Sequence, residues 1–149
     1  MLELEFKKCA KKKIIFKKRF EANHKEFSSF IHYLERQLEK FDCPMKPQAE
    51  ISVAAEEVFV NIVNYAYDTD MGTIDINIEF VEDERRFVLS FIDRGKPFDP
   101  LKKVDPDITQ SAEDRPIGGL GILMVKKTMD DLTYSFENGC NILTLTKII

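Results

Sequence analysis

Apolar residues recur at helical spacing through residues 50–67, EISVAAEEVFVNIVNYAY. On a wheel of 100° per residue they cover a broad arc, made of Ile51, Ala54, Ala55, Val58, Phe59, Ile62 and Val63. The remaining surface holds one narrow polar stripe, formed by Glu50, Glu57, Asn61 and Asn64. Because a helix that is apolar almost all round is usually buried, the pattern predicts a central helix whose stripe faces the interior or a cleft.

The polar stripe of this predicted helix has two interpretations. A carboxylate buried beside two amides is costly unless a partner compensates it, and a bound metal ion with a polyphosphate would do so. Alternatively, the helix belongs to the core and its stripe only touches solvent at a groove. The pattern of the helix alone does not choose between them.

The rest of the chain reads as strands and two further helices. Apolar side chains alternate with polar ones in a strand at 74–80, and a polar turn leads to a returning strand at 87–92. Asn23 is a candidate N-cap for a helix that runs to about Phe41. The other predicted elements are a strand at 11–20, a long polar loop at 99–117, a helix at 120–129, and strands at 132–136 and 141–148.

These elements predict an α+β fold in two layers. The sheet is expected to be mixed but mostly antiparallel, with the helices on one of its faces. At 149 residues the chain is long enough for one domain, spanning 1–149, with a substantial core.

Charge is unevenly distributed around the net value of −4. Residues 1–19 carry eight Lys or Arg and two Glu, which indicates either a lysine-guarded edge strand or a contact for an acidic partner. The rest of the chain is acidic, which argues against direct nucleic-acid binding. The three cysteines lack paired spacing, and neither a leader peptide nor a membrane-spanning run is evident, so we expect a cytoplasmic protein with no membrane contact.

Two glycine-bearing segments are candidate ligand sites. The first is DRGKPF at 93–98, directly after a strand, where Asp93 and Gly95 form either a simple turn or a base-reading pair. In the second reading, Asp93 accepts a hydrogen bond from an exocyclic amine such as that of adenine, and Gly95 lets a flat ring approach the backbone. The second segment, GGLG at 118–121, precedes a helix and either cradles phosphate or serves tight packing.

Taken together, the order of these motifs resembles the ATP-binding superfamily of gyrase, heat-shock-90 chaperones, MutL and histidine kinases, known as the Bergerat fold. EVFVN at 57–61 is similar to the N-box of that superfamily, DRGKPF at 93–98 to its first glycine box, and GLGI at 119–122 to its second. The loop between the two boxes is similar to the mobile lid. Within the superfamily the chain most resembles the small anti-sigma factor serine kinases.

The resemblance implies a role for each matched residue. Glu57 would be the general base that acts on a serine hydroxyl, and Asn61 would hold Mg²⁺ through its amide oxygen. Asp93 would read adenine, with Gly95 beneath the ring. Asn64 would support the phosphates or a metal-bound water.

The second glycine box would bind the phosphates through Gly119, Leu120, Gly121 and Ile122. Arg115, in the lid, would either reach the γ-phosphate or remain solvated. The chain departs from the family where members often carry Gly-Thr, because here Gly139 is followed by Cys140 and Asn141. Thr144 and Thr146 come later in the strand, and the sequence does not decide which group takes the place of the family threonine.

The function that the resemblance implies is therefore an ATP- and Mg²⁺-dependent protein-serine kinase. It would act as an anti-sigma regulatory factor, bind a sigma factor, and phosphorylate a serine on a small antagonist protein. A homodimer is also implied. Two alternatives remain: a module that binds ATP and a partner without transfer, and a histidine kinase catalytic domain that acts in trans.

Overall fold

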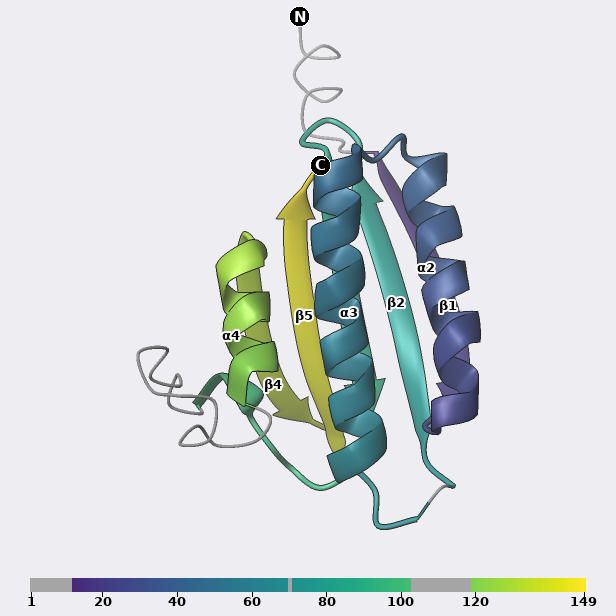
Figure 1. The fold of residues 1–149 in the computed structure, drawn as a ribbon, viewed down its shortest axis with the longest axis vertical. Coiled ribbons are helices and arrows are strands. Elements are labelled where there is room, and N and C mark those ends of the chain that lie inside the picture. The colour runs from purple at the N-terminus through teal and green to yellow at the C-terminus, as the bar shows by residue number, and fades with distance from the viewer. Residues whose placement is uncertain (1–11, 70, 103–118) are drawn as a thin grey trace, which may run out of the picture.

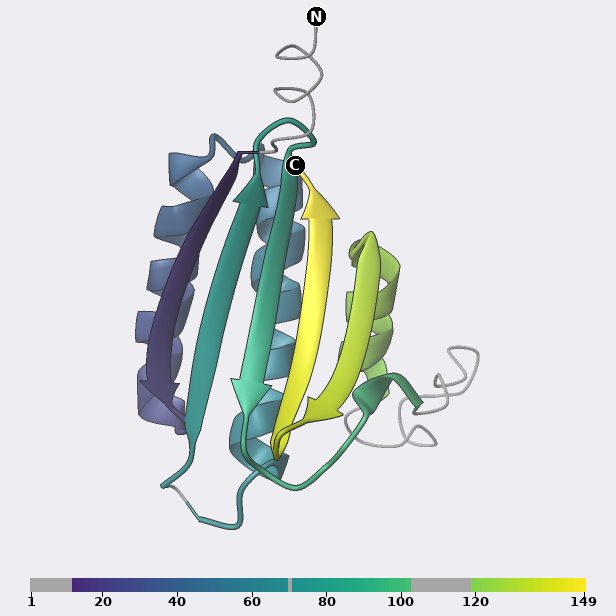
Figure 2. The same ribbon diagram turned by 180° about the vertical axis from the view of Figure 1, so that it is seen from behind.

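The computed structural model describes residues 12–69, 71–102 and 119–149. Its five strands form one sheet in the order β1-β2-β3-β5-β4 (Figures 1 and 2). Every strand pair among these residues is antiparallel, so the sheet is more uniform than the predicted mixed one. The strands are β1 (Lys13–Glu21), β2 (Thr73–Val81), β3 (Arg86–Asp93), β4 (Asp131–Glu137) and β5 (Cys140–Ile148).

The helices lie together on one face of the sheet, as predicted, and no described helix covers the opposite, open face (Figures 1 and 2). The long helix α3 (Met45–Tyr65) lies between α2 (Phe27–Lys40) and α4 (Gly119–Thr128) and contacts both of them, as well as β3 and β5. Short 3₁₀ turns occur at η1 (His24–Glu26) and η2 (Pro100–Lys102). The α+β two-layer fold expected from the sequence is confirmed.

Strict alternation in the strands separates the two faces of the sheet. In β2 every second residue, from Ile74 to Phe80, is buried against the helices, while the intervening polar side chains face outward. Stacked rings fill the layer between the sheet and the helices, with 4.7 Å between the centroids of Phe30 and Phe59. The ring centroids of Phe41 and Phe80 are 4.3 Å apart. Burial of these large rings supplies much of the hydrophobic stabilisation.

Two predicted boundaries need correction. The central helix begins at Met45 and not at residue 50, because Pro44 occupies its N-cap position and Pro47 lies within its first turn. Proline is tolerated there, since the first N–H groups of a helix have no partner within the helix. Helix α2 begins at Phe27 and not directly after the predicted cap Asn23, because η1 lies between them. Asn23 caps η1 instead, and its side chain accepts a hydrogen bond from the Glu26 N–H at 3.1 Å.

Other sequence predictions hold closely. The turn between β4 and β5 has φ values of 53° at Asn138 and 78° at Gly139, which suit a type I′ hairpin. β1 lies at the edge of the sheet, as expected for a strand guarded by lysines. Most of the predicted loop at 99–117, including Arg115, lies outside the described residues.

Within the described ranges, no helix has the length and apolar character needed to cross a membrane. Cys43 and Cys140 are both free thiols.

Candidate functional site

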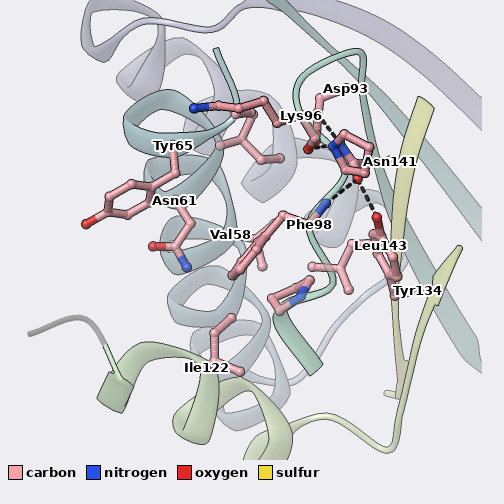
Figure 3. A pocket seen from close by; sticks show the side chains of 14 residues that line it. Val58, Asn61, Tyr65, Asp93, Lys96, Phe98, Ile122, Tyr134, Asn141 and Leu143 are labelled. Carbon is pink, nitrogen blue, oxygen red and sulfur yellow. Dashed lines mark hydrogen bonds between the residues drawn. The ribbon is translucent and has the colours of Figure 1, made fainter. Parts of the chain in front are cut away.

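A cavity of about 480 Å³ opens between the helix layer and one end of the sheet. It is bounded by α3, by the segment that follows β3, and by α4, β4 and β5. Figure 3 shows Asp93 and Asn141 at one end, Ile122 of α4 at the other, and Val58 and Asn61 of α3 between them. Three of the residues singled out in the sequence, Asn61, Asp93 and Ile122, therefore line one cavity.

Asp93 is the last residue of β3 and its side chain is 6% exposed. Its Oδ1 atom accepts hydrogen bonds from the Gly95 N–H and from Asn141 Nδ2, both at 2.9 Å. Burial raises the pKa of the carboxyl, and these two hydrogen bonds oppose that shift only in part. Among the described residues Oδ2 has no hydrogen-bond donor, so it is an acceptor available to a ligand in the cavity.

Gly95 is required by the way the chain packs. A Cβ at this position would overlap the backbone carbonyl of Ala66, just after the end of α3. The next residue fixes the same approach, because the Lys96 N–H donates to the Ala66 carbonyl at 3.0 Å. Gly95 thus lets the segment after β3 lie directly against α3, which places Asp93 beside the helix that carries Asn61.

Glu57 and Asn61 project from α3 one turn apart. Glu57 is half-buried, and its carboxylate lies so close to Gly121 that an added Cβ on the glycine would overlap Oε2. The structure thus brings the predicted base against the second glycine segment, at the start of α4. Within the described residues, neither the Glu57 nor the Asn61 side chain has a hydrogen-bond partner in the protein, so both are available to a ligand.

The other predicted residues are placed differently. Asn64 is exposed and does not line the cavity, because its Oδ1 atom lies 3.1 Å from His24 Nε2. Gly119 and Leu120 form the start of α4. Arg115 lies outside the described residues.

The structure also shows which residue of β5 contacts Asp93. Asn141 is buried and contacts Asp93 directly, since the two residues are opposite each other in the β3–β5 ladder. Thr144 faces the open side of the sheet, where its hydroxyl lies 3.0 Å from that of Ser90.

Several further residues of the cavity were missed by the sequence reasoning. Tyr65 and Phe98 are large exposed aromatics on its rim, and Lys96 and Tyr134 also line it. The alternation of Leu132, Tyr134 and Phe136 in β4 was a usable signal for Tyr134, because it places this side chain on the helix face. Lys96 and Phe98 lie within the predicted DRGKPF segment although neither was singled out there, and no comparable local pattern marks Tyr65.

With this geometry in view, comparison with known proteins defines the class. Residues 20–147 match the family described as the histidine kinase-like ATPase domain, and the chain belongs to this family. The fold is therefore that of a histidine kinase-like ATPase domain.

Similar proteins include serine-protein kinase RsbW of Bacillus thuringiensis subsp. konkukian, which is 35% identical over 104 residues. The aligned region is 67% of this chain and 63% of that protein, so the chain spans less than two thirds of its relative's length. RsbW of Bacillus cereus (strain B4264) is 36% identical over the same length, with the same shares of the two chains.

Solved structures agree on the fold. The RsbU and RsbW domains of Rv1364c from Mycobacterium tuberculosis superpose with a TM-score of 0.65 at 19% identity, over 90% of this chain and 32% of that one. The SiaB–SiaC complex from Pseudomonas aeruginosa gives a TM-score of 0.59 at 14% identity, over 100% of this chain and 98% of the matched chain.

Proposed function

We propose that this protein is an ATP-dependent protein-serine kinase that acts as an anti-sigma regulatory factor. One observation carries the proposal. The buried carboxylate of Asp93, whose Oδ2 atom has no donor among the described residues, shares a cavity with Asn61. Glu57 lies one helical turn before Asn61 on α3, beside Gly121. The similarity to RsbW serine-protein kinases supports the same activity.

The adenine base would bind at the Asp93 end of the cavity. Its exocyclic amine would donate to Asp93 Oδ2, which no described residue occupies. Val58, Ile62 and Leu143 provide apolar surface for the ring. The phosphates would then extend along α3 towards the start of α4, where the helix N-terminus favours negative charge.

Asn61 fits a magnesium ion that arrives with the nucleotide. No group of three or more His, Cys, Asp or Glu side chains suitable for a metal occurs in the described ranges. Mg²⁺ characteristically retains water and phosphate ligands and takes few from the protein, so one amide oxygen suffices. When bound, the ion would neutralise charge on the phosphates.

Glu57 would receive the proton of the substrate serine. The serine oxygen forms a bond to the γ-phosphorus while the bond from that phosphorus to the β,γ-bridging oxygen breaks, and ADP leaves. The hydroxyl proton passes to the Glu57 carboxylate. Phosphoryl transfer depends mainly on positioning and charge stabilisation, which this small set of residues can provide.

The partners proposed are a sigma factor and a small antagonist protein that carries the accepting serine, and the compartment is the cytoplasm. A direct test is to incubate the full chain with γ-labelled ATP, Mg²⁺ and candidate antagonist proteins. The proposal expects acid-stable label on a serine. Acid-labile label on histidine would indicate a histidine kinase domain acting in trans, and ATP binding with no transfer would indicate a non-catalytic switch module.

A further inference from the structure

Asn141 is the most densely hydrogen-bonded side chain at the cavity. It is 6% exposed and lies opposite Asp93 in the β3–β5 ladder. Its position also brings it diagonally close to Tyr134, because Tyr134 pairs with Leu143 on the neighbouring strand. Three strands and the segment after β3 thus meet at one amide.

The orientation of this amide is fixed by chemically opposite partners. Nδ2 donates to Asp93 Oδ1 and to the Lys96 carbonyl, each at 2.9 Å, with the Gly95 carbonyl further away at 3.4 Å. Oδ1 accepts from the Phe98 N–H at 3.1 Å and from the Tyr134 hydroxyl. A reversed amide would set its NH₂ group against the Phe98 N–H and its oxygen against three acceptors, so reversal is strongly disfavoured.

We propose that Asn141 is a positioning residue that makes the cavity selective for 6-aminopurines over 6-oxopurines. This inference rests on the proposed function, because it assumes that a purine nucleotide binds beside Asp93. Asn141 occupies Asp93 Oδ1 and so leaves Oδ2 to accept from an exocyclic amine. Both of its own N–H donors are already used, and none remains for the oxygen of a 6-oxopurine.

Asn141 also helps to keep Asp93 ionised. The pKa of Asp93 is raised by burial, and the hydrogen bond from Asn141 is the largest influence that lowers it. Without that donor the carboxyl would protonate at higher pH, and a protonated carboxyl can donate to a 6-oxo group. Among the described residues, the other titratable or charged groups near Asp93 are Tyr134 from β4, Tyr67 from the segment after α3, and Arg94 and Lys96 from its own segment.

The experiment compares ATP with inosine triphosphate, in which an oxygen replaces the 6-amino group. Dissociation constants are measured by calorimetry between pH 5 and pH 8 for the wild-type chain and for Asn141→Ala and Asn141→Thr. Thr144→Val is the matched control, because Thr144 is in the same strand but faces the open side of the sheet.

We expect Asn141→Ala to weaken ATP binding about tenfold, the range for a lost hydrogen bond to a charged group. Binding of inosine triphosphate should change little, so the ratio of the two affinities falls by a similar factor. The pH below which ATP binding declines should move upward. Asn141→Thr, whose hydroxyl can donate to Asp93, should restore part of both effects, and Thr144→Val should stay within about twofold of wild type.

Failure of this inference is distinguishable from failure of the proposed function. If the wild-type chain binds ATP and Asn141→Ala keeps the same affinity ratio and pH profile, the role of Asn141 is wrong while the kinase proposal stands. If the wild-type chain binds no ATP, both fall. Should Asn141→Ala not fold, Asn141→Thr decides, because it keeps one donor for Asp93 but loses the other contacts of the amide, and an affinity ratio and pH profile identical to those of wild type would overturn the proposal.

Discussion

Asp75 and Asp93 lie near the same end of the sheet but on its opposite faces, and their surroundings differ sharply. On the open face, both Asp75 oxygens accept from Arg19, at 2.6 and 3.0 Å, and this pairing lowers the pKa of Asp75. On the helix face, Asp93 is buried and forms no ion pair with any described residue, and burial raises its pKa. One carboxylate is satisfied by its own chain, whereas the other retains an unused acceptor.

This difference indicates where function lies in the fold. A buried carboxylate whose partners are all neutral destabilises the fold, so its presence indicates a binding site for a ligand that donates a hydrogen bond to its unused oxygen. Glu57 and Asn61, also on the helix side, are likewise without hydrogen-bond partners among the described side chains. The open face instead pairs its polar groups with one another, as in Arg19 with Asp75 and Ser90 with Thr144.

The largest expected effect comes from Glu57→Gln. It keeps the size of the side chain but removes the proton acceptor, so serine phosphorylation should fall by about 10²–10⁴-fold while the dissociation constant for ATP changes little. Initial rates of transfer, measured beside calorimetric binding of ATP, check this. The neighbouring Glu56→Gln, on the exposed side of α3, is the control and should keep the wild-type rate. A Glu57→Gln protein with wild-type transfer would show that the base is another group.

Asp93→Asn should have the next largest effect. Its amide oxygen can still accept from Gly95 and Asn141, which turns its NH₂ group towards the cavity in place of Oδ2. ATP binding should weaken about 10–100-fold, because an acceptor for the exocyclic amine has become a donor. Binding of inosine triphosphate should be retained or improved, and an unchanged preference for ATP would remove Asp93 from base recognition.

The same variant tests the stability of the nucleotide-free protein. Because the pKa of Asp93 is higher in the folded state than in the unfolded chain, the folded state binds more protons between the two values. The free energy of unfolding contributed by Asp93 is therefore lost as pH rises through the folded pKa. Above that pH, Asp93→Asn should unfold at a midpoint equal to or higher than that of wild type in thermal melts without ATP. A clear loss of stability there would show that the ionised carboxylate supports the fold.

Gly95→Ala should destabilise the protein by about 1–3 kcal/mol, since the new methyl group meets the backbone carbonyl of Ala66. Gly139→Ala is the matched comparison: its φ of +78° strains an alanine, but nothing lies within 4 Å of the added Cβ. Gly139→Ala should therefore leave ATP affinity unchanged, whereas Gly95→Ala should weaken it as Asp93 moves. Chemical denaturation and calorimetry measure the two quantities. If Gly95→Ala bound ATP as tightly as Gly139→Ala does, Gly95 would have no role in positioning the site.

Asp75→Asn should have the smallest effect. The Arg19–Asp75 pair is largely exposed, and such pairs contribute little. Because the pKa of Asp75 is lowered by folding, its contribution to stability is present above the unfolded pKa and is lost as pH falls through the folded value. The midpoint of unfolding should thus drop slightly at neutral pH and match wild type in acid, while ATP binding stays unchanged. Weaker ATP binding would contradict the assignment of separate roles to the two faces.

Local sequence was sufficient for much of the fold. The alternation of β2, the helical spacing of α3 and the strands on either side of the Asn138-Gly139 turn were all correctly predicted, because each depends on residues within a few positions. The sequence places the start of α3 too late, because the apolar periodicity begins only near residue 50, whereas the first turn contains Pro47, which is tolerated there. The chemically distinctive residues Glu57, Asn61 and Asp93 could be named for the same reason, as they carry their motifs in the chain.

Only the tertiary structure decided which of these residues meet. Asp93 and Asn141 are 48 positions apart and come together because the register of β3 and β5 sets them opposite each other. Glu57 lies against Gly121 because α3 packs beside α4, and Asn64 turns to His24 although it shares the polar stripe of α3. Periodicity along a chain fixes which face a side chain occupies, whereas its partners depend on strand register and helix packing, which are long-range.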